Sequence, residues 1–264
     1  MLKVTILQKT YHVAKHSSAK ALNFILSKEL EDLDVNILKI EFNKNKYSEI
    51  TLEGEDENIA KNFLITKYGT QKSVSNVKVG DQVFGHLKNV GEVKFGFFVD
   101  AGLKTSTQNI DALYPLFEAR NQLVDSRKAP LVAIQRAYGF IDNFPLIFEI
   151  TKKEILSKKI WVKLSDENIQ WLKEPLKEKK EALILCGATR RMIKQSLIRS
   201  RHTIDIEVVE RLGLLEYRLI CKRGTRAEGL IPELGPHLGR TKMGVQVLKR
   251  IKNLHNYELV EDGE

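Results

Sequence analysis

The sequence lacks several features that mark whole classes of proteins. Only two of its 264 residues are cysteines, Cys186 and Cys221, and neither belongs to a CxxC pair or a Cys/His cluster. A zinc site is therefore not expected, and both cysteines are interpreted as reduced core residues of a cytoplasmic protein. No run of about 18 apolar residues occurs, so no membrane span is predicted. The N-terminal segment MLKVTILQKTY becomes polar too soon for a signal peptide.

Signatures of catalysis are missing as well. The sequence contains no GxxxxGK[ST], GxSxG or HExxH motif, which argues against ATP hydrolysis and against nucleophilic or metal catalysis. His202 and Asp205 lie three positions apart, but on a strand their side chains would point to opposite faces. We therefore expect no catalytic residues, no metal and no cofactor.

Arginine is absent from the first hundred residues. Ten of the 13 arginines lie at or after Arg190, and residues 186–252 hold 15 Lys and Arg against 6 Asp and Glu. That segment carries the whole formal net charge of +9, so the rest of the chain is neutral. Guanidinium groups bind phosphates in a planar, bidentate geometry. A basic last third favours a polyanionic partner; a solvated basic surface without a partner is the alternative.

Hydrophobic periodicity predicts an α+β chain of three domains, the first of which covers residues 1–72. Its order is strand, helix, strand, strand, helix, a small βαββα domain. The strands are expected over residues 2–7, 35–42 and 47–53, and the helices over 16–30 and 54–69. A polar linker over residues 70–76 follows.

Residues 77–165 are predicted to form a small β-barrel with a helical insertion. Five short strands are expected over residues 82–89, 93–100, 111–116, 144–151 and 158–165. Residues 117–143 have a mostly helical pattern that is broken at Pro130. A further amphipathic helix over 165–180, interrupted at Pro175, is expected to connect the barrel to the last domain.

Residues 181–252 follow the order βαββαβ, which is the ferredoxin-like split motif. The strands are expected over residues 182–186, 203–209, 215–221 and 242–251, and the helices over 189–200 and 225–238. Each helix starts in a basic loop. The candidate phosphate-binding residues of these two loops are Arg190, Arg191, Lys194, Lys222, Arg223 and Arg226.

Helix N-termini favour phosphate groups, and we expect both basic loops to emerge on one edge of the sheet as a single patch for a nucleic-acid backbone. Two ordinary capped helices with solvated arginines are the alternative.

The stretch VGDQVFGHLKNVGEVKFGFFVD, residues 79–100, crowds three phenylalanines around Gly96. In a regular strand Phe95 and Phe97 share a face. A bulge at Gly96 would instead place Phe95 and Phe98 on one face and turn Phe97 inward. Two exposed rings beside lysines are suited to base stacking, and the lysines here are Lys88 and Lys94. The alternative is that all three rings belong to the core.

The same stretch resembles the opening of an S1 RNA-binding domain. Val79-Gly80-Asp81, Val83 and Gly85, and then Phe95-Gly96-Phe97-Phe98-Val99-Asp100, match the patterns Val-Gly-Asp-x-Val-x-Gly and Phe-Gly-x-Phe-Val of that family. The resemblance implies a five-stranded OB-type barrel in which Phe95 and Phe98 stack on RNA.

The chain departs from the S1 pattern at one position. The family's Gly-Leu-Val-His, whose histidine helps to bind RNA, is replaced by Ala112-Leu113-Tyr114-Pro115. Pro115 therefore stands at the position of the histidine, and Tyr114 is the candidate substitute ring. The resemblance assigns the family's late basic residue to Lys159.

The whole chain also resembles an archaeal family defined by domain of unknown function 2110, with an S1-like central module. The residues that carry this resemblance are LILCGATRRMIKQSLIRSRHTIDIEVVERLGLLEY and CKRGTRAEGLIPELGPHLG. It implies an archaeal cytoplasmic protein but no activity.

Together these observations predict a non-catalytic RNA-binding protein. The expected target is ribosomal or another structured RNA, or the ribosome itself, by analogy with factors that place an OB-type barrel beside a basic α+β domain. Two alternatives stay open. One is an RNA-processing or RNA-modifying enzyme with its active site between domains. The other is a protein–protein adaptor in a transcription or RNA-degradation assembly. The oligomeric state is not predicted.

Overall fold

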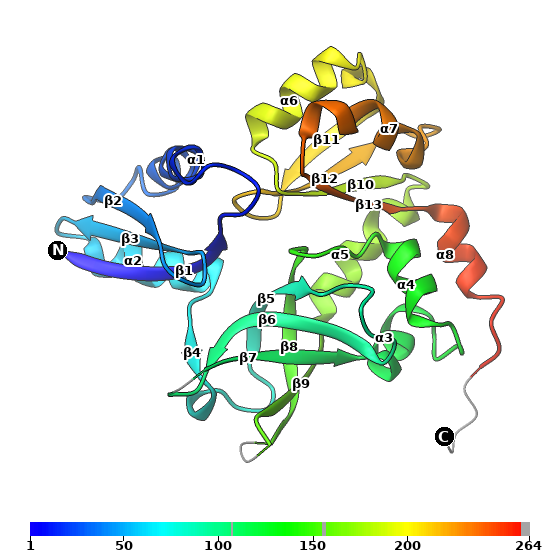
Figure 1. The fold of residues 1–264 in the computed structure, drawn as a ribbon, viewed down its shortest axis with the longest axis horizontal. Helices are drawn as coiled ribbons and strands as arrows, with labels where there is room; N and C mark the ends of the chain where they lie inside the picture. The colour runs from blue at the N-terminus through cyan, green and yellow to red at the C-terminus, as the bar shows by residue number, and fades with distance from the viewer. Residues whose placement is uncertain (107, 155–156, 260–264) are drawn as a thin grey trace.

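The computed structural model describes residues 1–106, 108–154 and 157–259, and three sheets organise them (Figure 1). The first sheet is antiparallel, with strand order β1-β3-β2. Its unit consists of β1 (Leu2–Lys9), α1 (Lys15–Glu29), β2 (Asn36–Phe42), β3 (Tyr47–Glu53) and α2 (Glu57–Tyr68). Apolar side chains from all these elements share one core, so the predicted order of strands and helices is confirmed.

The second sheet closes into a barrel. Its strands are β5 (Gln82–Lys88), β6 (Gly96–Lys104), β7 (Asn109–Pro115), β8 (Pro145–Glu154) and β9 (Lys159–Leu164). Around the barrel the order is β5-β6-β7-β9-β8 and back to β5, and within it β7 and β9 pair in parallel. This arrangement is consistent with an OB-like fold, and the barrel expected for the central region is confirmed.

The connection between β7 and β8 is helical, as predicted. It contains α3 (Leu116–Leu123) and α4 (Leu131–Tyr138), and Pro130 is the extended residue immediately before α4. A proline is favourable just before or at the start of a helix and unfavourable inside one. The break at Pro130 therefore separates two short helices.

The segment expected to be a polar linker, residues 70–76, is structured. Lys72–Ser73 form β4, which pairs in parallel with β6, and Val74–Asn76 form the 3-10 turn η1. Val74 and Val77 are buried in the barrel core. These two apolar side chains anchor the segment, and the first unit is joined to the barrel without a free linker.

The third sheet is reached through α5 (Asp166–Lys177), which tolerates Pro175 near its end. Its strands are β10 (Ala182–Cys186), β11 (Ile206–Arg211), β12 (Glu216–Cys221) and β13 (Lys242–Gln246), in the antiparallel order β11-β12-β10-β13. The helices α6 (Arg190–Arg199) and α7 (Ala227–Leu238) connect them. In the first sheet β1, β3 and β2 follow one another as β10, β12 and β11 do in the third, and among the described residues no strand of the first sheet corresponds to β13. None of the described helices is long and apolar enough to cross a membrane.

The prediction of a strand over residues 242–251 is wrong in its second half. The strand ends at Gln246, and α8 (Leu248–Leu254) follows it. Leu248, Ile251 and Leu254 recur at every third residue, which suits a helix better than a strand. Ile251 and Leu254 pack against the barrel core, and Figure 1 shows α8 beside α4.

The prediction of a strand over residues 203–209 is also wrong in its first three residues. Thr203–Asp205 form the 3-10 turn η2 before β11. Residues three apart are eclipsed in such a turn, so the His202 Nδ1 and Asp205 Oδ2 atoms lie 2.7 Å apart instead of on opposite faces. The hydrogen bond between these two side chains stabilises the turn.

The three units meet at a common junction. Leu214 and Leu215, just before β12, are buried in the core of the first unit. Ile184 and Cys186 of β10 belong to the same apolar cluster as the barrel interior. Both cysteines are buried and free of disulfides.

Candidate nucleic-acid interface

One row of side chains crosses the outer face of the barrel. Strand register pairs Lys88 of β5 with Phe98 of β6, Phe98 with Leu113 of β7, Leu113 with Trp161 of β9, and Trp161 with Lys152 of β8. Directly paired residues point to the same face of a sheet. We call these five residues the outer row. Phe98, Leu113 and Trp161 are half-buried, and the two lysines are exposed.

Phe95 extends the apolar part of the outer row. Its side chain is 56% exposed, and its ring meets that of Phe98 edge-to-face, with the ring centroids 6.0 Å apart. Phe97 and Val99 are buried in the barrel. The rings of Phe95 and Phe98 therefore come together on the outside while Phe97 fills the core, as the stacking hypothesis requires.

The expected bulge at Gly96 is wrong. Pairing between β6 and β7 is regular from Gly96 to Val99, and the irregularity lies between Val99 and Leu103. Phe95 reaches the outer face because it precedes β6 and does not follow the alternation of the strand. Gly96 allows β6 and β7 to approach each other closely. A Cβ at this position would lie 2.5 Å from the Tyr114 carbonyl oxygen and 2.9 Å from a methyl group of Leu113.

Trp161 is the aromatic member of the outer row that the sequence analysis missed, together with its neighbours Leu113 and Lys152. Ile160, Val162 and Leu164 are buried, so the alternation of KIWVKL turns Trp161 outward with Lys159 and Lys163. The Lys152 ammonium lies 4.9 Å from the centre of the indole ring. Because β7 separates β6 from β9, Trp161 and Phe98 lie roughly 10 Å apart, two strand spacings.

Lysines surround these rings, and some already contact carboxylates. Lys88 Nζ lies 2.6 Å from Asp111 Oδ2. Burial alone would lower the pKa of Lys88, but the hydrogen bond to Asp111 and its charge raise it above the ordinary value. Lys94 and Lys159 are exposed and have no ion pair within the described part of the chain. These two lysines are the ones most available to a phosphate.

The candidate role of Tyr114 in stacking is wrong. Its side chain is completely buried, and its ring stacks on that of Phe97 inside the barrel, with the centroids 6.0 Å apart. Ile110, Ala112 and Tyr114 are the inward residues of β7, so Leu113 takes the outward place. Burial raises the pKa of the Tyr114 hydroxyl well above its ordinary value. Pro115, at the position of the S1 histidine, is buried as well.

The two basic loops of the last unit do not form one patch. β10 and β12 are antiparallel, since Ala182 pairs with Ile220 and Cys186 pairs with Glu216. The loops that follow these strands therefore leave the sheet at opposite ends. The prediction of a single patch was wrong because β10 and β12, which are neighbours in the split motif, run in opposite directions.

The six candidate cations of these loops are exposed, three at each end of the sheet. Arg190 and Lys194 line an apolar groove beside α1, while Arg191 lies next to them on α6. Thr189 caps that helix by accepting a hydrogen bond from the Met192 N–H at 3.3 Å. At the other end, Arg223 donates to the Glu178 carbonyl at 3.2 Å, and Lys222 and Arg226 flank it in sequence.

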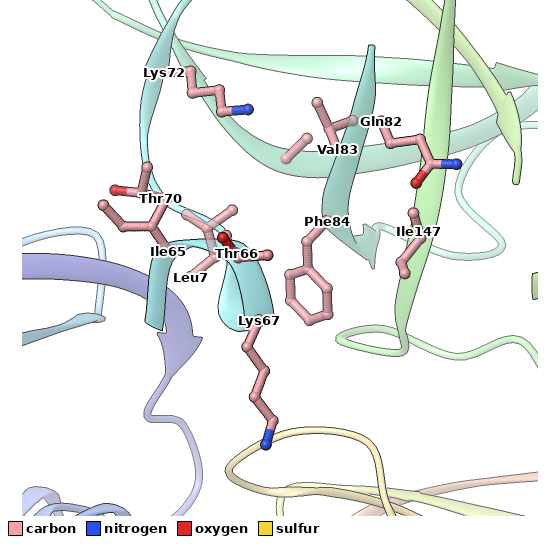
Figure 2. A pocket seen from close by; sticks show the side chains of 12 residues that line it. Leu7, Ile65, Thr66, Lys67, Thr70, Lys72, Gln82, Val83, Phe84 and Ile147 are labelled. Atoms are coloured by element: carbon pink, nitrogen blue, oxygen red, sulfur yellow. The ribbon is translucent and has the colours of Figure 1, made fainter. Parts of the chain in front are cut away.

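A separate hollow lies at the seam between the first unit and the barrel. Figure 2 shows Phe84 of β5 projecting between the end of α2 and Ile147 of β8, with the Lys67 side chain extending beyond the Phe84 ring. Leu7 and Val83 provide its apolar wall. Lys67 is engaged with Glu29 at 3.1 Å. Among the described residues, the lining of this hollow holds no histidine, cysteine or carboxylate.

Comparison with models of known protein families shows which family the chain belongs to. Residues 3–74 match the DUF2110 N-terminal domain, residues 77–175 the DUF2110 central domain and residues 180–246 the DUF2110 C-terminal domain. The chain belongs to the DUF2110 family. The family expected from the sequence is thereby confirmed, and its three domain matches divide the chain near the three sheets.

Other comparisons add little to the family assignment. No curated protein matches the sequence significantly. Among solved structures, the intact alpha subunit of aIF2 from Pyrococcus abyssi aligns over 64% of this chain and 97% of that chain, with 10% identity and a TM-score of 0.24. A TM-score this low supports no conclusion about fold or function.

Proposed function

We propose that this DUF2110 protein binds RNA without catalysing a reaction, and that bases stack on the outer row together with Phe95. The observation that supports the proposal is a continuous apolar strip, Phe95, Phe98, Leu113 and Trp161, facing outward from a barrel whose core is already filled. Contiguous exposed apolar residues commonly mark a binding surface. Rings flanked by lysines suit single-stranded nucleic acid in particular.

The proposal also concerns the cellular location of the protein and the kind of RNA that it binds. The barrel is S1-like in its opening motifs, and the last unit is ferredoxin-like in strand order and basic in composition. We propose an archaeal, cytoplasmic protein whose target is ribosomal or another structured RNA with an accessible single strand. The two basic loops would contact phosphates on separate sides of that RNA, because they lie at opposite ends of their sheet.

Fluorescence anisotropy with a labelled single-stranded RNA tests the proposal. About 15 nucleotides suffice, because one OB fold covers about 4–16. The Phe95→Ala/Phe98→Ala variant should bind at least about tenfold more weakly, since each stacked base contributes about 1–3 kcal/mol. Phe63→Ala is the matched control, because Phe63 is 38% exposed on α2 and belongs neither to the outer row nor to a basic loop. Equal affinity of the wild type and the double variant would refute stacking on this face.

A second candidate function, a protein–protein adaptor, is favoured by a different surface. An apolar groove of about 580 Å³ lies between α1 and α6, with Arg190 and Lys194 at its edge. Phe24 and Ile198 line it and are 73% and 57% exposed. Apolar walls with cationic edges suit the apolar face of an acidic amphipathic helix.

The adaptor function has its own test. A labelled acidic amphipathic peptide should bind the wild type, and Phe24→Ala should weaken that binding while Phe95→Ala/Phe98→Ala leaves it unchanged. Loss of peptide binding in the barrel variant, or no peptide binding at all, would remove this candidate.

A further inference from the structure

A polar cavity of about 370 Å³ lies where the first unit meets the outer face of the barrel. We call it the junction pocket. Its lining residues include Lys9, His12 and Lys46 from the first unit and His86, Asp100 and Asn143 from the barrel. A volume of this size is within the range of sites for small organic ligands. The side chains offer both charges and hydrogen-bonding groups.

His86 is the feature that marks this cavity as a binding site. It stands on the outer face of β5, two residues before Lys88, and the first unit covers it so that only 1% of its surface is exposed. Neither ring nitrogen has a hydrogen-bond partner among the described residues. Buried polar groups in folded proteins nearly always have a partner. An unpaired imidazole in the wall of a polar cavity therefore points to a ligand.

The protonation state of His86 defines what it can recognise. Burial, together with the nearby Lys9 ammonium, lowers the pKa of His86 to about 3. The ring is therefore neutral at neutral pH and offers one donor and one acceptor. This pattern suits a polar, uncharged group such as the edge of a nucleobase or a ribose hydroxyl.

The charges around the junction pocket favour an anion. Lys9 pairs with Asp100, and Lys88 pairs with Asp111. Lys46 lies at the exposed edge and has no ion pair with any described residue. Three lysines against two aspartates leave one uncompensated positive charge. A phosphate at this edge would supply the matching negative charge.

The junction pocket continues the outer row. Lys88 and Asp111 line the pocket, and Lys88 is the residue directly opposite Phe98. A strand of RNA lying on the outer row would therefore reach the pocket at the β5 end of the row.

We propose that the junction pocket binds one nucleoside monophosphate unit, with its phosphate toward Lys46 and its base or ribose against His86. The unit is either a nucleotide of the RNA bound on the outer row or a free mononucleotide. Only the first source rests on the proposed function; the second does not require RNA binding.

Calorimetric titration of the full-length protein with the four ribonucleoside 5′-monophosphates tests the proposal, and RNA anisotropy runs in parallel. His86→Phe removes both ring nitrogens and keeps a flat aromatic ring, and Lys46→Gln removes the free charge at the edge. Lys44→Gln is the matched control, because Lys44 lies in the same turn but outside the lining. We expect His86→Phe to weaken binding by about tenfold and Lys46→Gln by several-fold, with Lys44→Gln unchanged.

The outcomes separate this inference from the proposed function. Mononucleotide binding that His86→Phe weakens, in a protein that does not bind RNA, would support the pocket and refute the RNA proposal. RNA binding that His86→Phe weakens, without mononucleotide binding, would assign the pocket to a residue of the RNA. The inference is overturned if neither ligand distinguishes His86→Phe from the wild type. Circular dichroism and thermal melting of each variant confirm that it is folded.

Discussion

Two fully buried groups near the junction should make stability depend on pH in opposite directions. Burial raises the pKa of Glu216 to about 7, although Tyr11 and the Leu215 N–H donate hydrogen bonds to its carboxylate. Burial and the Lys9 ammonium lower the pKa of His86 to about 3. The ordinary values are 4.5 for the glutamate and 6.5 for the histidine. Both shifts therefore influence the free energy of unfolding between pH 4.5 and 6.5.

The direction of each pH effect depends on whether the folded protein or the unfolded chain binds the proton of that group more tightly. The folded protein holds the Glu216 proton more tightly than the unfolded chain, so this contribution is full below pH 4.5 and is lost as the pH rises to about 7. The unfolded chain holds the His86 proton more tightly, so stability is lost as the pH falls from 6.5 toward 3. Each group changes the free energy of unfolding by about 1.4 kcal/mol per pH unit, and in the wild type the two changes offset each other.

Variants that remove one group at a time expose the other. From pH 4.5 to 6.5, His86→Phe should lose about 3 kcal/mol of unfolding free energy relative to the wild type, and Glu216→Gln should gain about as much. Urea titrations followed by circular dichroism, at several pH values in this window, measure the difference. The exposed His237→Asn is the control. Identical pH dependence of all four proteins would refute the reasoning from burial.

Three further predictions concern the barrel. Trp161→Ala should weaken single-stranded RNA binding about 5–150-fold, the loss of one stacked base, with an unchanged salt dependence in anisotropy titrations; a loss of salt dependence would mean that phosphates are contacted instead. Tyr114→Phe should leave RNA affinity unchanged and should not lower the melting temperature, because its buried hydroxyl has no hydrogen-bond partner among the described residues; a clear loss of affinity would return Tyr114 to the interface. Gly96→Ala should destabilise the barrel by about 1–3 kcal/mol in urea titrations, because its Cβ would lie 2.5 Å from the Tyr114 carbonyl oxygen; unchanged stability would show that β6 and β7 can separate at this point.

Local pattern predicted much of this fold, because most elements bury their own apolar face. The helical insertion broken at Pro130 and the alternating strands of the first unit are examples. Prediction was poorest where a neighbouring unit decides the outcome. Residues 248–254 form a helix whose spacing the sequence does contain, but the surface that buries Ile251 and Leu254 belongs to the barrel, which is distant in sequence.

The candidate site was predicted in part. The pairing of Phe95 and Phe98 outside and Phe97 inside was anticipated, although through a bulge that is not there. Alternation along β7 would have excluded Tyr114, and alternation along β9 would have found Trp161. The burial of His86 was beyond reach, because the first unit, distant in sequence, covers an outward position of β5.

The most direct test of the central claim is to locate bound RNA on the protein. Single-stranded RNA containing 4-thiouridine is bound to the full chain, cross-linked with ultraviolet light, and the attached peptides are identified by mass spectrometry. Stacking on the outer row predicts cross-links at Phe95, Phe98 and Trp161. Cross-links confined to the basic loops of the last unit or to the groove beside α1, with none on the barrel, would contradict it.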